Sequence, residues 1–181
     1  VGLISNYKNM VTMDLKETGS ILLVIGKTEG HLDQSLFSRD ILNEKNGPPP
    51  EINLFNEKNN GETVLKLIDK KFIKAAHDVS LGGIITALSK MCIKGKRGAI
   101  LKKPGYLINQ FEYLFGEDQG RYIIEVAKDN LQDVFKILSE NSVHFDELGT
   151  VNENNLIIDD KSKLSIDDLI KSHTTWLTNY M

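Results

Sequence analysis

The chain has 181 residues, of which 40% are hydrophobic and 26% are charged, a balance that predicts one globular domain with a substantial core. Its net charge of −3 argues against general binding to nucleic acids or anionic membranes, which favour basic proteins. The single cysteine, Cys92, excludes an internal disulfide, and no signal peptide or membrane-spanning apolar run is visible, so we expect a cytoplasmic protein.

The first predicted element is a buried strand at residues 19–26, a short apolar run bounded by glycines. It follows an N-terminal arm, residues 1–13, in which residues 2–4 have some strand character. After the strand we expect a helix from Ser35 to about residue 43. The Gly-Pro-Pro-Pro sequence at 47–50 ends that helix and leaves an extended segment.

Apolar residues at helical spacing predict two further helices. The first covers residues 62–73, and its apolar residues are Val64, Leu65, Ile68 and Phe72. The second follows Gly83 and ends at Gly95, and its apolar residues are Ile84, Leu88, Met91 and Cys92. Because Cys92 lies on this apolar face, it is interpreted as a core residue rather than a nucleophile.

The second half of the chain continues with both strands and helices. A helix is predicted at residues 131–138, and Ser165 followed by Asp168 resembles a capping signal for a last helix that runs toward Trp176. The predicted strands are residues 99–101, 122–126 and 156–158. The whole pattern predicts a single α+β domain.

The most specific polar sequence is Ala-His-Asp-Val-Ser-Leu-Gly-Gly at residues 76–83, on a strand-to-helix turn. Asp78 could bind a divalent cation, and the glycines would let backbone amides approach a phosphate. The simpler interpretation is that Asp78 or Ser80 caps the next helix and that the glycines permit close packing. The sequence is neither a Walker loop nor a Rossmann fingerprint, because it lacks the Gly-Lys-Ser/Thr sequence and the third glycine.

A second cluster, residues 114–121, comes directly before the strand at 122–126. Its adjacent carboxylates, Glu117 and Asp118, together with Gln119 and Arg121, could hold a metal-phosphate group or orient a sugar. Equally, the carboxylates could be solvated, with Arg121 neutralising one of them. A third candidate, residues 33–35, could be no more than the start of a helix.

The remaining polar residues indicate no catalytic centre. The sequence contains no nucleophilic triad, and its four histidines lack the close spacing of metal ligands. We therefore assign no catalytic residue.

Five short sequences occur in a fixed order along the chain. They are Gly-Ser-Ile-Leu-Leu-Val-Ile-Gly at 19–26, Gln-Ser-Leu-Phe at 34–37, Pro-Pro-Pro-Glu-Ile-Asn-Leu at 48–54, Ala-His-Asp-Val-Ser-x-Gly-Gly at 76–83 and Leu-Phe-Gly-Glu-Asp-Gln-x-Arg at 114–121. In this order they resemble the C-terminal end of the synthetase subunits (PurL) of the phosphoribosylformylglycinamidine synthase family. The resemblance covers essentially the whole chain.

The resemblance implies an ATP-dependent ligase of purine biosynthesis, which uses ATP, Mg²⁺ and ammonia from a glutaminase subunit to convert formylglycinamide ribonucleotide to its amidine. Family members contain two copies of a nucleotide-binding domain followed by an α+β domain. This chain resembles the second α+β copy, a three-layer α/β/α domain like the C-terminal domain of aminoimidazole ribonucleotide synthetase. Residues 1–12 would be the tail of the preceding domain or a connector, and residues 13–181 the domain itself.

The resemblance also implies partners and an inactive fragment. The partners would be the upstream nucleotide-binding domains of the same chain and the glutaminase and small subunits of a complex, with neither nucleic acid nor membrane. Because the family's catalytic histidines and most of its ATP contacts lie upstream, the chain alone is expected to be inactive. Its start at Val1 agrees with a piece of a longer protein.

The site residues implied by the resemblance belong to an auxiliary nucleotide or metal site. Asp78 would be a Mg²⁺ ligand, and the nucleotide-binding candidates would be Gln34, Ser35, Glu117, Asp118 and Gln119. Two residues depart from the family pattern. Leu81 replaces a common acidic residue, which lowers cation affinity, and Asp33 replaces a usual glycine, which would repel a phosphate.

A second hypothesis is a free-standing nucleotide- or phosphate-binding module from a related branch. Such branches include thiamine-monophosphate kinase, hydrogenase-maturation proteins and selenophosphate synthetase. The missing initiator methionine and the sequence Gln119-x-Arg121 favour the ligase fragment.

Overall fold

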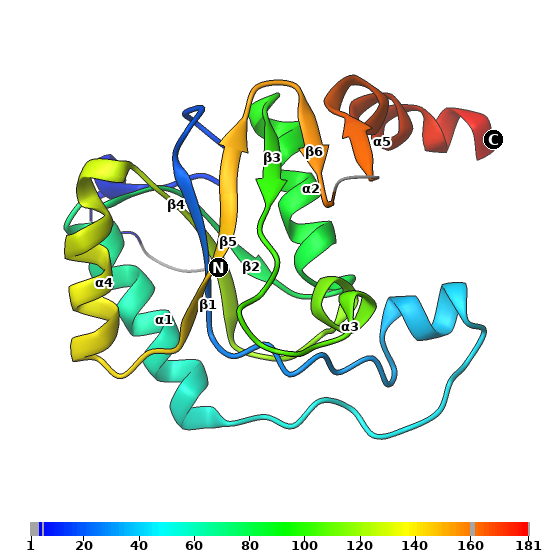
Figure 1. Cartoon of the computed structure of the whole chain (residues 1–181), viewed down its shortest axis with the longest axis horizontal. Helices are drawn as coiled ribbons and strands as arrows, with labels where there is room; N and C mark the ends of the chain where they lie inside the picture. Colours follow the sequence, from blue (N-terminus) through cyan, green and yellow to red (C-terminus); the bar gives the residue numbers. More distant parts are fainter. Residues whose placement is uncertain (1–3, 5, 160–161, 181) are drawn as a thin grey trace.

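A computed structural model describes residue 4, residues 6–159 and residues 162–180 of the chain. Seven strands in these residues form one sheet (Figure 1). The strands are β1 Ile21–Ile25, β2 Ile73–Val79, β3 Gly98–Leu101, β4 Arg121–Val126, β5 Phe145–Asn152, β6 Asn155–Ile157 and β7 Lys163–Ser165. Their order across the sheet is β2-β4-β1-β5-β3-β6-β7, and only the pairing of β3 with β6 is parallel.

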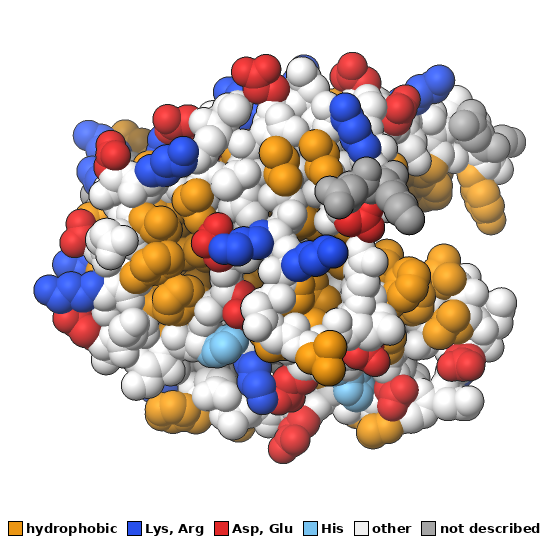
Figure 2. All heavy atoms as spheres, in the orientation of Figure 1, with side chains coloured by type: hydrophobic (Ala, Val, Ile, Leu, Met, Phe, Trp, Pro, Cys, Tyr) orange, Lys and Arg blue, Asp and Glu red, His pale blue; other side chains and the backbone are white. Residues whose placement is uncertain are grey.

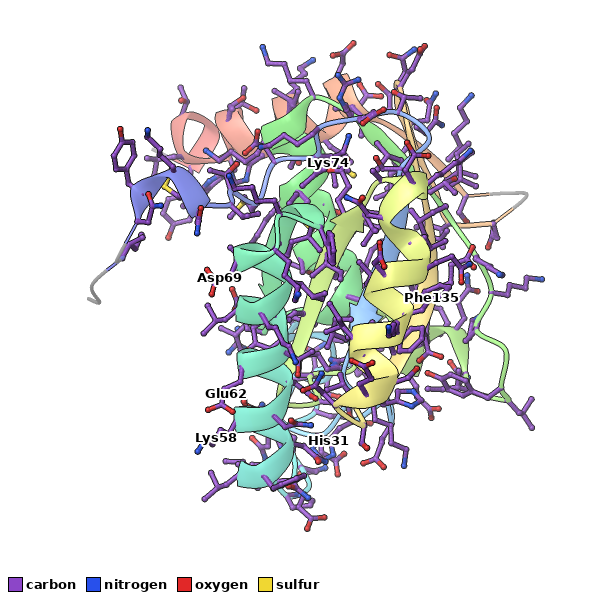
Figure 3. All side chains as sticks on the ribbon, turned by 90° about the vertical axis from the view of Figure 1, so that its left-hand side faces the viewer. His31, Lys58, Glu62, Asp69, Lys74 and Phe135 are labelled. Carbon is purple, nitrogen blue, oxygen red and sulfur yellow. The ribbon has the colours of Figure 1, made fainter. Side chains whose placement is uncertain are left out.

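Helices cover both faces of this sheet. The helical segments of the described residues are η1 Tyr7–Asn9, η2 Phe37–Ile41, α1 Leu54–Asp69, α2 Gly83–Gly95, α3 Gln110–Phe115, η3 Lys128–Asn130, α4 Leu131–Glu140 and α5 Ile166–Tyr180. Helices α1 and α4 lie side by side on one face (Figure 3), and α2, α3 and the start of α5 contribute to the core on the other. The prediction of a three-layer α+β domain is therefore confirmed. None of the helices in the described part of the chain is both long and apolar enough to cross a membrane.

Strand β1 lies in the middle of the sheet, and both of its faces are covered. Leu22 and Val24 belong to the core beneath α2, while Leu23 and Ile25 belong to the core beneath α1 and α4. Every residue of the strand is buried as a result. This explains why its sequence is a continuous apolar run rather than an alternating one.

Several sequence predictions are confirmed at the level of whole elements. The predicted strands at 19–26, 99–101, 122–126 and 156–158 correspond to β1, β3, β4 and β6. The helix after Gly83 ends at Gly95 as expected, and its four predicted apolar residues are all fully buried. The last helix also has the predicted cap, because the backbone N–H of Asp168 donates to Ser165 Oγ at 3.4 Å.

The predicted helix at 62–73 is wrong in its limits and in part of its apolar face. The helix α1 begins at Leu54, because the Asn53 side chain accepts a hydrogen bond from the backbone N–H of Asn56 at 3.0 Å and caps it. Leu65 is 61% exposed, whereas Leu67, two residues further, is fully buried. Phe72 follows the end of the helix.

Other differences concern short or polar segments. The helix expected from Ser35 is only the short π-helical segment η2. The sequence analysis missed β5, β7 and α3, and it recognised β2 only as the strand before the glycine turn. The strand character suggested for residues 2–4 falls mostly on residues outside those that the structure describes.

Candidate functional site

The turn between β2 and α2 brings the start of α2 against the segment 114–117. Gly82 and Gly83 have φ angles of 82° and 69°, in the left-handed region that favours glycine. A Cβ atom on Gly83 would lie 2.6 Å from the carbonyl oxygen of Leu114, so this position also needs glycine for close packing. The glycines of the turn therefore have a packing role in this chain.

The carboxylate of Glu117 links this turn to the loop after β1. Its Oε1 accepts hydrogen bonds from the backbone N–H groups of Gly82 and Leu36, both at 2.8 Å. Glu117 itself is buried. Its side chain thus supplies the acceptor for two backbone donors that come from distant parts of the sequence.

The carboxylate of Asp118 organises the loop that follows β1. Its Oδ2 accepts from the N–H groups of Glu29 at 3.3 Å and Gly30 at 3.0 Å, and its Oδ1 accepts from His31 N–H at 3.1 Å. Asp118 is buried. Three successive backbone donors around one carboxylate form an anion-binding concavity that the protein fills with its own side chain.

Arg121 completes this network from the first residue of β4. Its guanidinium donates to the carbonyl oxygens of Asp118 at 3.1 Å and Gly116 at 2.6 Å and to Thr28 Oγ1 at 3.1 Å. Its Nη1 also lies 3.5 Å from Asp118 Oδ2. Burial lowers the pKa of Arg121, and the nearby Asp118 carboxylate opposes this shift only in part. The Asp118 carboxylate is therefore the charged partner of the buried guanidinium.

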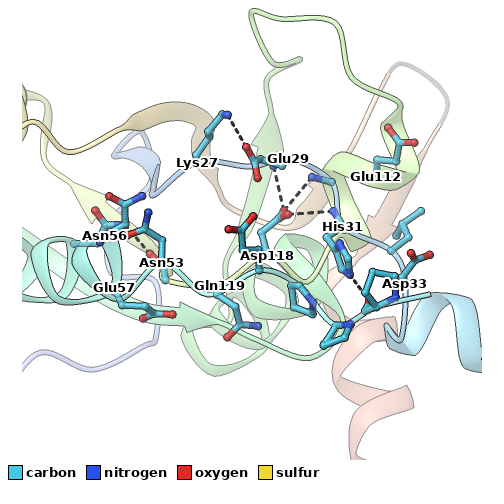
Figure 4. Close-up of a pocket in the computed structure, with 18 residues that line it drawn as sticks. Lys27, Glu29, His31, Asp33, Asn53, Asn56, Glu57, Glu112, Asp118 and Gln119 are labelled. Carbon is cyan, nitrogen blue, oxygen red and sulfur yellow. Dashed lines mark hydrogen bonds and ion pairs between the residues drawn. The ribbon is translucent and has the colours of Figure 1, made fainter. Parts of the chain in front are cut away.

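A cavity of about 840 Å³ opens beside this network (Figure 4). The loop after β1 forms one side, and the Pro-Pro-Pro segment and the first turns of α1 form another. His31 joins these sides, since its Nε2 lies 3.0 Å from the carbonyl oxygen of Pro48. The volume is within the range of small-molecule sites in proteins, which makes this cavity the candidate site.

Two of the six predicted site residues line the cavity, namely Asp118 and Gln119. Gln34 has a positive φ of 60°, and its Nε2 donates to the carbonyl oxygens of Lys45 and Gly47, so it closes the loop at 34–47. Ser35 is fully buried, and its Oγ accepts from the N–H of Ser38 at 3.1 Å. The structure brings Gln34 and Ser35 next to the cavity loop but not to its lining.

Asp78 does not line the cavity; it lies near the end of β2, opposite Tyr122 of β4. Its side chain is 62% exposed, and Oδ1 lies 3.1 Å from His77 Nδ1. Among the described residues, no group of three or more histidine, cysteine, aspartate or glutamate side chains has the arrangement of a metal site. These residues therefore do not complete a Mg²⁺ site around Asp78 on their own.

The residues that line the cavity carry a strong excess of negative charge. Its only lysine among the described residues, Lys27, lies 2.5 Å from Glu29 in an ion pair. The carboxylates around the cavity are those of Glu29, Asp33, Glu51, Glu57, Glu112 and Asp118. Such a surface disfavours a bare phosphate and suits a neutral or cation-paired ligand.

The sequence analysis missed the contribution of α1 to this cavity. Asn53, Asn56, Glu57 and Asn60 reach it from the first two turns of the helix. The available signal was the cap at Asn53, which places the helix start directly after the Pro-Pro-Pro segment.

The family described as AIR synthase related protein, C-terminal domain, matches residues 17–161 of the chain. The chain belongs to this family. The match to the AIR synthase related domain includes all six predicted site residues and every residue that lines the cavity.

The chain is also similar to named proteins along its whole length. The phosphoribosylformylglycinamidine synthase subunit PurL of Pelagibacter ubique is 84% identical over 181 residues, which is 100% of this chain and 25% of that protein. The subunit PurL of Bartonella bacilliformis is 38% identical over the same 181 residues, or 24% of its length. The chain therefore spans about a quarter of the length of these curated relatives.

A solved structure supports the fold of this AIR synthase related domain. It is described as T. maritima PurL complexed with FGAR, with a TM-score of 0.75 over 91% of this chain and 30% of that chain. The sequence identity is 20%, so the likeness establishes the fold alone.

In this AIR synthase related domain, replacing Glu117 with alanine is expected to lower the free energy of unfolding by about 2–3 kcal/mol, because two buried N–H groups lose their acceptor. Glu117→Gln keeps a carbonyl oxygen at the same place and should cost less than half as much. Urea denaturation followed by circular dichroism measures both. Equal losses for the two variants would contradict the acceptor role.

Proposed function

We propose that the chain is the C-terminal domain of an ATP-dependent ligase of de novo purine biosynthesis. The full enzyme would convert formylglycinamide ribonucleotide, glutamine-derived ammonia and ATP into formylglycinamidine ribonucleotide. The observation that carries this proposal is the 84% identity to the Pelagibacter ubique subunit along the entire chain. The chain alone would be inactive.

The contribution of this domain to the enzyme is structural support for a ligand cavity. Glu117, Asp118 and Arg121 use their polar atoms to hold the loop after β1, and that loop forms one wall of the cavity. Gln119 lines the same cavity, and its Nε2 donates to the carbonyl oxygen of Glu117 at 3.2 Å. We therefore assign these residues a positioning role beside an auxiliary nucleotide, together with Gln34 and Ser35.

The ATP and Mg²⁺ of the proposed reaction would be held mainly outside this chain. The excess of carboxylates in the cavity is compatible with a nucleotide only if cations accompany its phosphates. Asp78 remains a candidate Mg²⁺ ligand, and the other ligands would have to come from the upstream part of the enzyme. Residues 1–12 would be the tail of the preceding domain or a connector, and residues 13–181 the present domain.

The proposed partners are the upstream nucleotide-binding domains, a glutaminase subunit and a small subunit, in the cytoplasm. A chimera tests the proposal. The segment of the Pelagibacter ubique subunit that matches this chain is replaced by the chain, and the amidine product formed from ammonia and ATP is measured. We expect activity comparable to that of the parent subunit, and none from the isolated chain.

Two controls make the result decisive. The parent subunit without the matching segment should be inactive, which shows that the domain is needed. A chimera that folds and has the oligomeric state of the parent, but forms no product, would overturn the proposed function.

A further inference from the structure

Helix α5 has one apolar side that runs along its whole length. Its large apolar residues occupy positions spaced three and four apart, which lie on one side of a helix. They are Ile166, Leu169, Ile170, Trp176, Leu177 and Tyr180, and His173 is the remaining residue in this row. The two aspartates and the lysine of the helix lie at other positions. The helix is therefore amphipathic from its first turn to its last.

Only the first half of this apolar side is covered by the domain. Ile166 is buried, and the next two apolar residues of the row pack against the core beneath α2. In contrast, Trp176 is 60% exposed, Leu177 50% and Tyr180 84%. Figure 1 shows the C-terminal half of α5 projecting away from the sheet. After Ile170, none of the described side chains of the helix is buried.

The exposed half of α5 lacks the charged residues that usually cover a helix in water. Residues 172–180 include no lysine, arginine, aspartate or glutamate. Tryptophan and tyrosine are enriched at the centres of protein interfaces, where charged residues are depleted. A short helical segment gains little stability from its own hydrogen bonds and depends on packing. Composition and exposure together indicate a surface that another protein segment covers.

The exposed apolar side of α5 borders a notch at one end of the molecule (Figure 2). Hydrophobic side chains lie on both sides of this notch, over α5 on one side and over η2 and α3 on the other. Ile41 and Phe111 of the second side are more than half exposed. The rings of Phe37, Phe111 and Phe115 lie with their centroids 4.8–6.4 Å apart and hold η2 against α3. Two apolar walls suit a protein segment better than a small polar ligand.

The remainder of the proposed ligase chain is the partner that fits this surface. The chain spans 25% of the Pelagibacter ubique subunit, so three quarters of that protein lie outside it. The AIR synthase related domain matches only residues 17–161 and leaves out α5, whereas the two PurL relatives match all 181 residues. The matches that include α5 are therefore those to subunits about four times as long as this chain.

We propose that the upstream part of the ligase chain occupies the notch and packs against Trp176, Leu177 and Tyr180. A segment of the same polypeptide keeps this apolar surface covered at all times, whereas a subunit that dissociates would leave it open to aggregation. The upstream surface opposite these side chains is apolar, because a charge buried there would lack a partner. The docking surface depends on the proposed function, since its partner is the rest of the ligase chain.

Thiol labelling of the chimera described above tests this docking surface. Leu177→Cys places a thiol on the apolar side of α5, and Thr178→Cys places one on the exposed polar side as the matched control. The thiol at position 177 should react with N-ethylmaleimide at least about tenfold more slowly than the thiol at position 178, because a docked helix must open before it reacts. Mass spectrometry of the C-terminal peptide measures both rates, each relative to the rate in urea.

The role of Trp176 as an anchor is tested in the same way. Adding Trp176→Ala to Leu177→Cys should raise the labelling rate toward that of Thr178→Cys. Adding Lys171→Ala instead, on the exposed polar side of the helix, should leave the rate unchanged. Hydrogen exchange of residues 172–180 in the chimera without these substitutions gives an independent measurement, and we expect these amides to be protected.

Three outcomes would overturn the proposal. One is equal labelling of Leu177→Cys and Thr178→Cys in the folded chimera, together with unprotected amides at 172–180. Another is protection that increases with protein concentration alongside a dimer in sedimentation, which would mean that a second copy covers α5. The third is protection that appears only after a glutaminase subunit is added. An inactive chimera with slow labelling would contradict the proposed function alone, because the labelling requires no product formation.

Discussion

Replacing Arg121 with alanine is expected to lower the free energy of unfolding by about 3–5 kcal/mol. The guanidinium is buried and donates to two backbone carbonyls and to Thr28 Oγ1. Its removal leaves those acceptors without a donor and leaves the Asp118 carboxylate without its cationic neighbour. Each of these losses is unfavourable in a buried environment.

The effect should extend to the loop after β1, because Asp118 holds the backbone of Gly30 and His31. Arg121→Lys preserves the charge but cannot donate in the same forked geometry, so we expect an intermediate loss. Urea denaturation monitored by circular dichroism measures the three proteins. Limited proteolysis at residues 27–36 shows whether the loop has become more accessible.

Arg39→Ala is the matched control for this experiment. Arg39 also pairs with an aspartate, Asp40, at 2.7 Å, but both side chains are more than half exposed. Exposed ion pairs contribute little to stability, so this variant should unfold almost as the parent does. If Arg121→Ala were no less stable than Arg39→Ala, the proposed role of the network would be wrong.

The sequence predicts the buried strands of the fold well and its polar strand badly. Strand β5 is the neighbour of both β1 and β3, yet its sequence contains acidic residues and a glycine that are rare in strands. Gly149 is needed there because a Cβ atom would lie 2.0 Å from the carbonyl oxygen of Ile100. This close approach depends on the sheet, so no local pattern in the sequence reveals it.

The same limit applies to the candidate site. Glu117 and Asp118 have the side chains of ligand-binding residues, but the structure shows that their oxygens accept hydrogen bonds from backbone N–H groups. Every residue except proline carries such a donor, so a sequence cannot show which ones lie near a carboxylate. The cavity itself combines segments as distant as residues 27–33 and 118–120, and only the fold brings them together.

Glu125 is a buried carboxylate outside the candidate site, and it holds the segment that precedes β1. It is fully buried in β4, where its Oε2 accepts from Lys16 N–H at 2.7 Å and its Oε1 accepts from Glu17 N–H at 2.9 Å. Replacing it with alanine leaves both donors without an acceptor. We expect Glu125→Ala to lower the free energy of unfolding by about 2–4 kcal/mol in urea denaturation.

The stability contributed by Glu125 should also depend on pH. Burial raises the pKa of Glu125, and the hydrogen bond from Lys16 N–H opposes this only in part. Since the pKa is higher in the folded than in the unfolded protein, the folded state binds the proton more tightly. The stability that comes from this tighter proton binding is therefore fully present below the pKa of glutamate in the unfolded protein, about 4.3. It is lost as the pH rises through the pKa of Glu125 in the folded protein.

Glu125→Gln separates this pH dependence from that of the other groups, because glutamine is neutral at every pH. The free energy of unfolding of the parent minus that of Glu125→Gln should decrease between about pH 4.3 and neutrality. Glu62→Gln, at an exposed pair on α1, should show no such trend. A difference that stayed constant or increased with pH would mean that the folded protein prefers the ionised carboxylate, with the two N–H groups outweighing burial.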